Sequence, residues 1–574
     1  MARQFSIRKI QQTSLTKEEF DDDLIFRILA SRGVKSGQEV DYDLKHLMPP
    51  TSIQYLFDAA DLLVSNLMAG NPILIFGDYD ADGATSTALC IRALDQMYCE
   101  NLEFLIPDRV IDGYGLSISA ADRIISVNPA LVVTVDNGVA SFAGISKLRN
   151  RDINVIVTDH HLPADSLPDA NVIVNQNAFP DLTSGKNLAG VGIAFYLMLA
   201  VRQKLREQRW FTDLKPEPNL GNCLDLVALG TIADLVPLDY QNRLLVNAGI
   251  QRMRKGVCCP GIKALILQAN KSLSDITSTD LAFIIGPRLN AAGRLEDMRT
   301  GVLCLLANDA QLASEYAAYL SDVNQQRKML QDQMNQEALE QIDCRIKDKN
   351  SAKLSVLYDE SWHEGVVGIV AARVREKQFC PSIVFAGQAD GPIKGSGRSI
   401  PGVHLRDILD LVDKRHPGLI LKFGGHAMAA GLTIKHESLA DFEKYLHQVI
   451  VDQVDPNCFS EEVLHDGPLK IGHLTLEYAQ KINELGPWGQ KFPLPGFVGD
   501  FQVQEKRVLS GKHLKFVLSN PKPSVKTTID AIAFNQSPEL LQKEFDNISL
   551  HYELAINRFR NNESVQLIIR DILD

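Results

Sequence analysis

Three short apolar segments, each followed at once by acidic residues, constrain the fold of this chain more than any other feature. They cover residues 72–76, 131–135 and 155–158. Continuous apolar runs of this length, rich in β-branched residues, are typical of strands buried on both faces of a sheet. Hydroxyl residues at 85–87 are suited to begin a helix after the first run. The repeated strand, loop and helix pattern predicts a parallel α/β sheet, in which ligands bind beyond the carboxyl ends of the strands.

Acidic and histidine side chains gather at that predicted edge. They are Asp78, Asp80 and Asp82 after the first run, Asp136 after the second, Asp159, His160 and His161 after the third, and Asp234 after the apolar run 226–233. Several carboxylates at close range cannot all stay ionised without a cation. Mixed aspartate and histidine ligands favour Mn²⁺, with Mg²⁺ as a substitute, over an all-oxygen Ca²⁺ site. We therefore expect a metal site, and two divalent ions are a common means of cleaving phosphoesters.

Each motif taken alone has a simpler interpretation. An Asp-x-Asp-x-Asp run is more often a solvated or calcium-type loop, an Asp-Asn-Gly sequence is usually a turn, and paired histidines can lie in a core or on a surface. We expect Asp78, Asp80 and Asp82 to converge by strand alternation, with Gly83 allowing a sharp turn. Asp225 competes with Asp234 for the last ligand position.

Changes in composition and residue pattern along the chain predict several domains. Residues 1–45 are mixed and polar and form an N-terminal extension, and 46–307 hold the acidic clusters. Residues 308–350 contain a long helix over 313–342, which has no proline or glycine, and 351–455 form a second α/β unit with a glycine-rich loop at 394–399. Residues 456–574 alternate in short runs that predict a small β-barrel, where Arg507 and Lys515 beside Phe516 suit single-stranded nucleic acid.

Composition excludes some classes of protein. The formal net charge of −12 argues against a protein that coats duplex DNA indiscriminately, although it leaves room for a local basic channel. No apolar run approaches the roughly 18 residues of a membrane span, and the first residues lack the apolar core of a secretory signal. The nine cysteines form no Cys-x-x-Cys pair, which favours a reducing cytoplasm over a disulfide framework.

The order of the clusters resembles the DHH phosphoesterase superfamily, and Gly424–His426 resembles its DHHA1 domain. Further stretches resemble the RecJ family of bacterial single-strand-specific exonucleases: Ile106–Arg109, Gly113–Leu116, Gly286–Arg294, Trp362–Gly365 and the Gly-Pro-Trp-Gly sequence at 486–489. The resemblance covers about 45–574. It implies a multidomain α/β protein, with a parallel-sheet DHH domain, a DHHA1 domain joined by the long helix, and a C-terminal OB-like barrel.

The resemblance also implies roles for individual residues. Two divalent ions would be held by Asp80, Asp82, Asp136, His160 and Asp234, with Asp78 close by, Asp136 bridging, and Asp82, Asp136 and His161 taking part in catalysis. Some superfamily members have a histidine shortly before the acidic pair, where this chain offers Asp78, so the choice between Asp78 and Asp80 stays open. DNA or phosphate contacts are expected from Arg109, Tyr114, Arg288, Asn290, Ser396, Arg398 and His426.

The function implied is a 5′→3′ exonuclease on single-stranded DNA, acting in recombination and repair. The expected partners are single-stranded DNA and, from the family, a single-strand-binding protein and a repair helicase; the chain is expected to be a cytoplasmic monomer. Two alternatives remain. One is a DHH phosphodiesterase for short oligonucleotides or cyclic dinucleotides, whose members usually lack the barrel and the long helix. The other is a non-catalytic RecJ-like scaffold, which would have lost several of the ligands present here.

Overall fold

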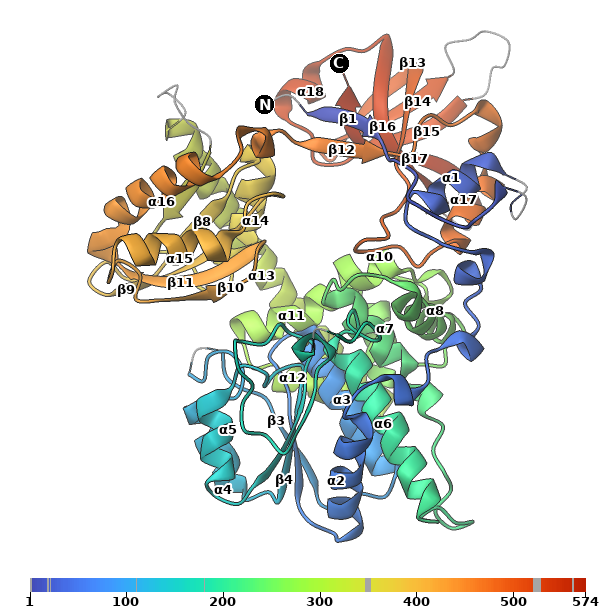
Figure 1. Cartoon of the computed structure of the whole chain (residues 1–574). Coiled ribbons are helices and arrows are strands. Elements are labelled where there is room, and N and C mark those ends of the chain that lie inside the picture. Colours follow the sequence, from blue (N-terminus) through green and yellow to red (C-terminus); the bar gives the residue numbers. More distant parts are fainter. Residues whose placement is uncertain are drawn as a thin grey trace. The chain divides into compact units, whose positions relative to one another are not determined.

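The structure is a computed structural model, and it describes residues 3–17, 20, 22–109, 111–179, 181–345, 353–519, 528–559 and 562–573. The chain divides into two compact units, whose helices and strands are labelled in Figure 1. The larger unit contains Ile7–Gly293, Asp297–Ser321 and Leu464–Asp574, and the smaller unit contains Met1–Ser6, Arg294–Glu296 and Asp322–Val463. No helix among the described residues is long and apolar enough to cross a membrane.

The larger unit is built on a five-stranded parallel sheet with the order β3-β2-β4-β5-β6. The strands are β2 (Ile73–Phe76), β3 (Leu102–Leu105), β4 (Leu131–Val135), β5 (Asn154–Thr158) and β6 (Val172–Val174). The predicted parallel sheet and its three strands at 72–76, 131–135 and 155–158 are confirmed. Phe76 pairs with Thr134, and Val135 with Thr158, so the central strands end at one edge.

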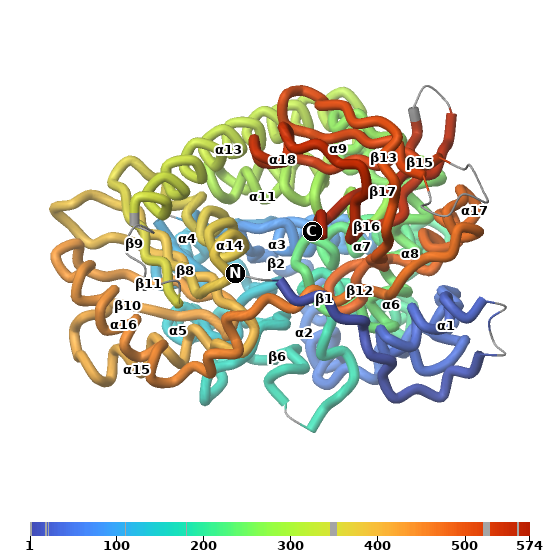
Figure 2. The backbone as a smooth tube through the Cα atoms, turned by 90° about the horizontal axis from the view of Figure 1, so that it is seen from above, coloured from blue at the N-terminus to red at the C-terminus, as the bar shows by residue number. Residues whose placement is uncertain are grey.

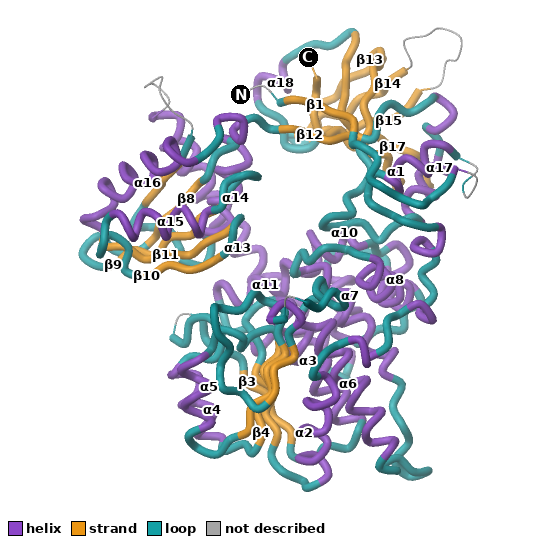
Figure 3. Tube along the Cα trace, in the orientation of Figure 1, coloured by secondary structure: helices purple, strands orange, loops and turns teal. Residues whose placement is uncertain are grey.

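Helices cover both faces of this sheet (Figure 3). One face carries α2 (Leu56–Met68), α3 (Ala81–Gln96) and α6 (Gly190–Glu207), and the other carries α4 (Ile118–Val127) and α5 (Phe142–Arg149). Side chains of a strand point alternately to the two faces. Ile73 and Ile75 therefore join the core beneath the first set of helices, whereas Leu74 and Phe76 join the core beneath the second. Burial on both sides explains why the strand is a continuous apolar run.

Further helices complete the larger unit. They are α7 (Leu224–Ala233), α8 (Tyr240–Arg254), α9 (Pro260–Gln268), α10 (Ser278–Asp280), α11 (Gly286–Leu295) and α12 (Arg299–Leu306). A π-helical segment, Leu281–Ile285, precedes α11. The 36-residue helix α13 (Ala310–Arg345) then leads from the larger unit into the smaller one, as its continuous course in Figure 2 shows. It is the predicted connecting helix.

The smaller unit has a mixed sheet with the order β10-β11-β9-β8-β7. Its elements are β7 (Ser355–Tyr358), α14 (Val367–Gln378), β8 (Ser382–Ala386), β9 (Pro392–Arg398), α15 (Leu405–Arg415), β10 (Lys422–Gly425), β11 (Ala429–Lys435) and α16 (Leu439–Gln453). The prediction of a glycine-rich loop at 394–399 is wrong, because this stretch is mostly strand β9. Its glycines are needed because a Cβ at Gly395 would lie 2.4 Å from the Phe385 ring.

The C-terminal segment forms the predicted closed barrel, with the order β13-β14-β15-β17-β16. Its strands are β13 (Phe497–Leu509), β14 (His513–Ser519), β15 (Thr528–Ala533), β16 (Asn547–Phe559) and β17 (Asn562–Leu573). One expectation about its surface is wrong: Phe516 is fully buried in the barrel and cannot stack on a base. Lys515 forms an ion pair of 2.8 Å with Asp530, and Arg507 pairs with Glu505. Alternation along β14 turns Phe516 inward and Lys515 outward.

The N-terminal segment contains a strand, a helix and one side of a buried ion pair. Strand β1 (Gln4–Ile7) pairs with β12 (Glu462–His465), and α1 (Asp23–Ala30) precedes Arg32. The guanidinium of Arg32 donates to both carboxylate oxygens of Asp466 at 2.7 and 2.9 Å, and both side chains are almost fully buried. The barrel belongs to the same compact unit as the parallel sheet. The predicted domain boundaries at 45, 307, 350 and 455 stay predictions.

Candidate metal centre

The loop after β2 leads into a helix earlier than the sequence predicted. Helix α3 begins at Ala81 rather than at the hydroxyl residues 85–87. Asp80 is its N-cap, and Asp80 Oδ1 accepts a hydrogen bond from the Gly83 N–H at 2.9 Å. Aspartate is among the strongest N-cap residues, so the acidic motif itself begins the helix. Asp82 therefore lies in the first helical turn, and the acidic side chains converge along a strand, loop and helix rather than by strand alternation.

Close packing, not a turn, explains Gly83. Gly83 is helical, and a Cβ at this position would lie 2.6 Å from the Asp78 backbone, so the expected sharp turn is wrong. Asp78 is buried beside it, with 2% of its surface exposed. Asp82 accepts hydrogen bonds from the Gly190 and Val191 N–H groups, at 2.6 and 2.9 Å, where α6 begins. The positive end of that helix stabilises the Asp82 carboxylate.

Asp136 follows β4 in a left-handed backbone conformation, with φ of 63°. Aspartate tolerates this region better than most residues. The side chain is buried beside the start of α6, where a Cβ on Gly190 would lie 2.5 Å from the Asp136 Cβ. The glycine therefore lets α6 approach the centre.

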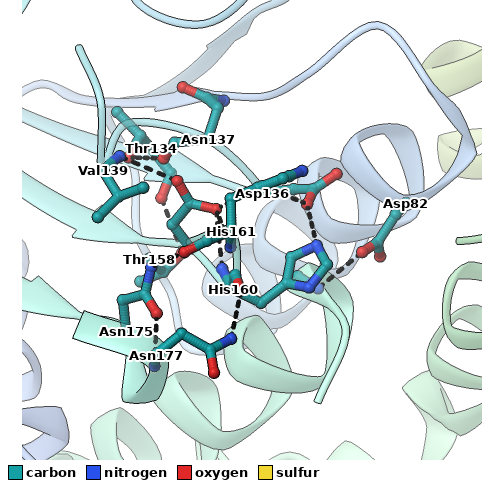
Figure 4. A network of polar contacts seen from close by, with 12 residues as sticks. Asp82, Thr134, Asp136, Asn137, Val139, Thr158, His160, His161, Asn175 and Asn177 are labelled. Carbon is teal, nitrogen blue, oxygen red and sulfur yellow. Dashed lines mark hydrogen bonds and ion pairs between the residues drawn. The ribbon is translucent and has the colours of Figure 1, made fainter. Parts of the chain in front are cut away.

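Asp159 holds the two histidines in place. Its Oδ1 accepts from the His160 and His161 N–H groups and from His161 Nδ1, at 2.8, 3.0 and 2.7 Å, and Figure 4 shows the histidines within this network. Burial alone would raise the pKa of Asp159, but the hydrogen bond and charge of His161 outweigh it and lower that pKa. Burial would likewise lower the pKa of His161, but Asp159 and the nearby carboxylates raise it to about 9.

Two asparagines that the sequence reasoning missed support the same loop. Asn175 Nδ2 donates to the His161 carbonyl at 2.8 Å, and Asn177 Nδ2 donates to the His160 carbonyl at 2.6 Å (Figure 4). Both follow β6, the neighbour of β5 in the sheet. Like the acidic residues, they follow the end of a strand, which is a signal the sequence contains. Strand β6 has only three residues, however, and is too short to be recognised from the sequence.

Asp234 joins the centre and Asp225 does not. Asp234 is the C-cap of α7, and its Oδ2 lies 3.4 Å from His160 Nε2. Asp225, near the other end of α7, accepts from the Leu226 and Cys259 N–H groups at 2.8 and 2.7 Å. Among the described residues, it belongs to no cluster of potential metal ligands. The geometry therefore favours Asp234 in the choice that the sequence left open.

The side chains form three overlapping clusters whose ligand atoms lie within 4.8 Å of one another. They are Asp78, Asp80 and Asp136; Asp82, His160 and Asp234; and Asp136, His160 and His161. Both Asp78 and Asp80 thus lie within reach of an ion, so the geometry does not choose between them.

Several polar atoms in these clusters make no hydrogen bond, although an acid and an imidazole among them lie close together. Asp78 Oδ1, Asp136 Oδ1 and His160 Nε2 are buried and have no hydrogen-bond partner within the described parts of the chain. Asp136 Oδ1 and His160 Nε2 lie only 3.1 Å apart (Figure 4). Burial and neighbouring carboxylates raise the pKa values of Asp78, Asp82 and Asp136 well above their usual range. Buried, unsatisfied oxygen and imidazole atoms facing one another fit divalent cations.

Helix α11 fixes the acidic loop from outside. Asn290, predicted to contact DNA, accepts a hydrogen bond from the Ala81 N–H at 2.8 Å through its side-chain oxygen. One turn later, a Cβ on Gly293 would lie 1.7 Å from the Tyr79 carbonyl oxygen. The Gly286–Arg294 stretch therefore supports the loop that holds Asp78, and the contact of Asn290 is with protein.

Arg109 and Tyr114 lie next to the centre in the larger unit. The Arg109 guanidinium lies 5.2 Å from the centre of the Tyr79 ring. The Tyr114 ring packs edge-on against Tyr79 and His161, and its hydroxyl lies 3.1 Å from His161 Nε2. The exposed arginine and tyrosine therefore extend the site from His161 toward solvent.

The other predicted DNA contacts have protein contacts as well. Arg288 donates to the Ile284 carbonyl and to Ser321 Oγ, at 2.5 and 3.2 Å. In the smaller unit, Arg398 donates to Ser396 Oγ at 3.0 Å, and Gly368 packs against both side chains. His426 is exposed in the turn between β10 and β11. The roles of these residues in DNA binding stay predictions.

Comparison with known proteins identifies the family. The model of the DHH family, N-terminal domain, matches residues 72–231, the DHHA1 domain matches 329–452, and the RecJ OB domain matches 465–571. The single-stranded-DNA-specific exonuclease RecJ of Escherichia coli (strain K12) is 44% identical over 576 residues, which cover 98% of this chain and 99% of that protein. RecJ of Salmonella typhimurium is 43% identical over 579 residues, with the same coverage. The crystal structure of Thermus thermophilus RecJ with Mn²⁺ matches at a TM-score of 0.81 and 27% identity, covering 100% of this chain and 79% of that one. The chain therefore belongs to the RecJ family.

Proposed function

We propose that this chain is a metal-dependent exonuclease that hydrolyses single-stranded DNA from its 5′ end, in recombination and repair. The observation that carries the proposal is the cluster of buried aspartates and histidines with unsatisfied ligand atoms at the carboxyl edge of the sheet. The substrate follows from relatives named as single-stranded-DNA-specific exonucleases over nearly the whole chain. The direction of digestion and the pathway rest on the family resemblance.

The residues fit two divalent ions. Asp78, Asp80 and Asp136 would hold one, and Asp82, His160 and Asp234 the other, with Asp136 between them because it belongs to two of the three clusters. Mixed oxygen and imidazole donors favour Mn²⁺, with Mg²⁺ as a substitute; Thermus thermophilus RecJ has been crystallised with each. Such ions supply a nucleophile from water near neutral pH and neutralise charge on the phosphate oxygens.

The protein's own groups orient the phosphate. Asp159 occupies His161 Nδ1, which leaves Nε2, beside the Tyr114 hydroxyl, to contact the scissile phosphate or to move a proton. Arg109 offers a bidentate fork near this edge of the site. Arg288, Asn290, Ser396, Arg398 and His426 remain proposed contacts to the strand or its terminal phosphate.

Digestion of end-labelled strands tests the proposal. Single strands labelled at the 5′ or the 3′ end, a blunt duplex and a cyclic dinucleotide are incubated with Mn²⁺ and with chelator. We expect immediate release of the 5′ label as a mononucleotide, only from single strands and only with metal. Asp136→Asn keeps the shape of the side chain and tolerates the left-handed backbone, and it should abolish activity. Asp95→Asn, on exposed surface at the far end of α3, is the matched control. Cleavage of the cyclic dinucleotide alone would replace the proposal with a small-substrate phosphodiesterase.

The surroundings of the enzyme are also proposals. We place it in the cytoplasm, because all nine cysteines are free and eight of them are wholly or partly buried. We propose that it acts as a monomer, with a single-strand-binding protein and a repair helicase as partners. Sedimentation velocity tests the first, and co-purification at endogenous levels tests the second.

A further inference from the structure

A cavity in the larger unit lies away from the metal centre. It has a volume of about 320 Å³, within the range of small-ligand sites, and is lined by Arg92, Gln96, Asn222, Asp225 and Arg252 together with apolar and cysteine side chains. Arg92 is near the C-terminal end of α3, whereas Asp80 caps the N-terminal end. At 1.5 Å per residue these ends are separated by roughly 18 Å. Asp225 and Asp234 are likewise separated by about 13 Å along α7.

Positive charge converges on this cavity in an otherwise acidic protein. Arg92 comes from α3 and Arg252 from the last turn of α8. Arg92 is braced by donating to the carbonyls of Leu305 and Ala307 at 3.0 and 3.1 Å. Arg252 Nη2 donates to Asn222 Oδ1 at 2.7 Å, but its Nε is buried with no hydrogen-bond partner in the described chain. A guanidinium has five N–H donors, so both arginines keep N–H groups that these bonds do not use.

The carboxylate in the cavity wall does not cancel this charge. Asp225 is fully buried, and both its oxygens already accept backbone N–H groups, from Leu226 and Cys259. Two guanidinium groups therefore face one internally bonded carboxylate, which leaves an excess of positive charge. Helices α7 and α9 also begin at this wall, and their N-termini add partial positive charge. Leu226, Val257 and Pro260 give the cavity an apolar side.

We propose that this cavity binds a phosphate group, either on a small monoester or as the free ion. Guanidinium forks match phosphate oxygens, and an apolar wall suits the organic part of such a ligand. Two sources share this chemistry: a nucleoside 5′-monophosphate and free inorganic phosphate. Asp225, which competes with Asp234 in the sequence, belongs to this second site. The binding test does not require nuclease activity, because it is carried out without metal.

Calorimetric titration of the full-length chelated protein tests the proposal, with dTMP, inorganic phosphate and thymidine as probes. We expect dTMP to bind and thymidine not to bind. Arg252→Gln should weaken dTMP by about tenfold or more, the loss of one charge-assisted contact. Lys255→Gln, an exposed charge just past the same helix end, should have no effect. Equal binding of phosphate and dTMP would support the site with free phosphate as its source.

A second variant protects the test against misfolding. If circular dichroism shows that Arg252→Gln is not native, Gln96→Glu places a negative charge at the partly exposed rim without removing a packed group. It should also weaken dTMP binding. Two results overturn the proposal: no binding of either phosphate compound to the chelated wild type, or unchanged binding in a natively folded Arg252→Gln or Gln96→Glu variant.

Discussion

Replacing Gly293 by alanine should damage the metal centre from outside it. The new Cβ would lie 1.7 Å from the Tyr79 carbonyl oxygen and 2.9 Å from the carbonyl carbon. The atoms that the new Cβ meets belong to the Tyr79 backbone, so no side-chain rotation can relieve the overlap. Ordinary contact requires the helix and loop to separate by more than about 1.5 Å, and a misplacement of about 1 Å can cost on the order of 100-fold in rate. We therefore expect kcat to fall by about 100-fold or more, because Asp78 and Asp80 flank the displaced residue.

The change in the free energy of unfolding distinguishes steric overlap from helix propensity, because the two predict opposite signs. Gly293 lies inside α11, and in an unconstrained helix glycine to alanine is stabilising by about 1 kcal/mol. The overlap predicts destabilisation instead. Urea unfolding in chelator and Mn²⁺-dependent digestion of a labelled single strand measure the two effects. Gly472→Ala, where a Cβ meets nothing within 4 Å, is the matched control and should behave as wild type. A Gly293→Ala protein that is more stable and fully active would refute the argument.

Three further predictions concern charge. Because the pKa values of Asp78, Asp82 and Asp136 are raised, the metal-free folded state binds more protons than the unfolded state, and its stability falls as pH rises above about 4. Ions need the ionised carboxylates, so the gain in Tm on adding Mn²⁺ should grow from pH 5 to pH 8. A constant gain would count against the site. Asp159→Asn should lower kcat by about 10- to 100-fold, because the amide has one acceptor oxygen and no charge, so it cannot both hold His161 and accept from the Val139 N–H; unchanged kinetics would contradict this role. Asp466→Asn should destabilise the protein by about 3–5 kcal/mol in urea unfolding, because Arg32 is left buried without a countercharge; a loss below about 1 kcal/mol would show that the pair is dispensable.

The sequence predicts the sheet and the members of the site because both depend on local patterns. Strands such as β2 and β4 are buried on both faces, and parallel strands must end at one edge, so acids after them meet. What the sequence cannot give is how each acid is presented. The spacing of Asp78, Asp80 and Asp82 also fits strand alternation, which is what the sequence predicted. In the structure Asp80 is instead the N-cap of α3. Phe516 lies inside the barrel because closure fixes which face is inward.

Residues distant in sequence account for the rest, and they explain how the fold holds the acidic residues close together. Asp82 is bonded to the start of α6, the histidine loop to Asn175 and Asn177, and the acidic loop to Asn290. Each of these hydrogen bonds ties an acidic side chain, or the backbone of the acidic or histidine loop, to another part of the fold. The cost of assembling the charges is therefore met by the surrounding fold, and the ligand atoms left without partners, on Asp78, Asp136 and His160, are those that face one another. Ligand atoms that make no hydrogen bond and gather in clusters are preorganised for cations.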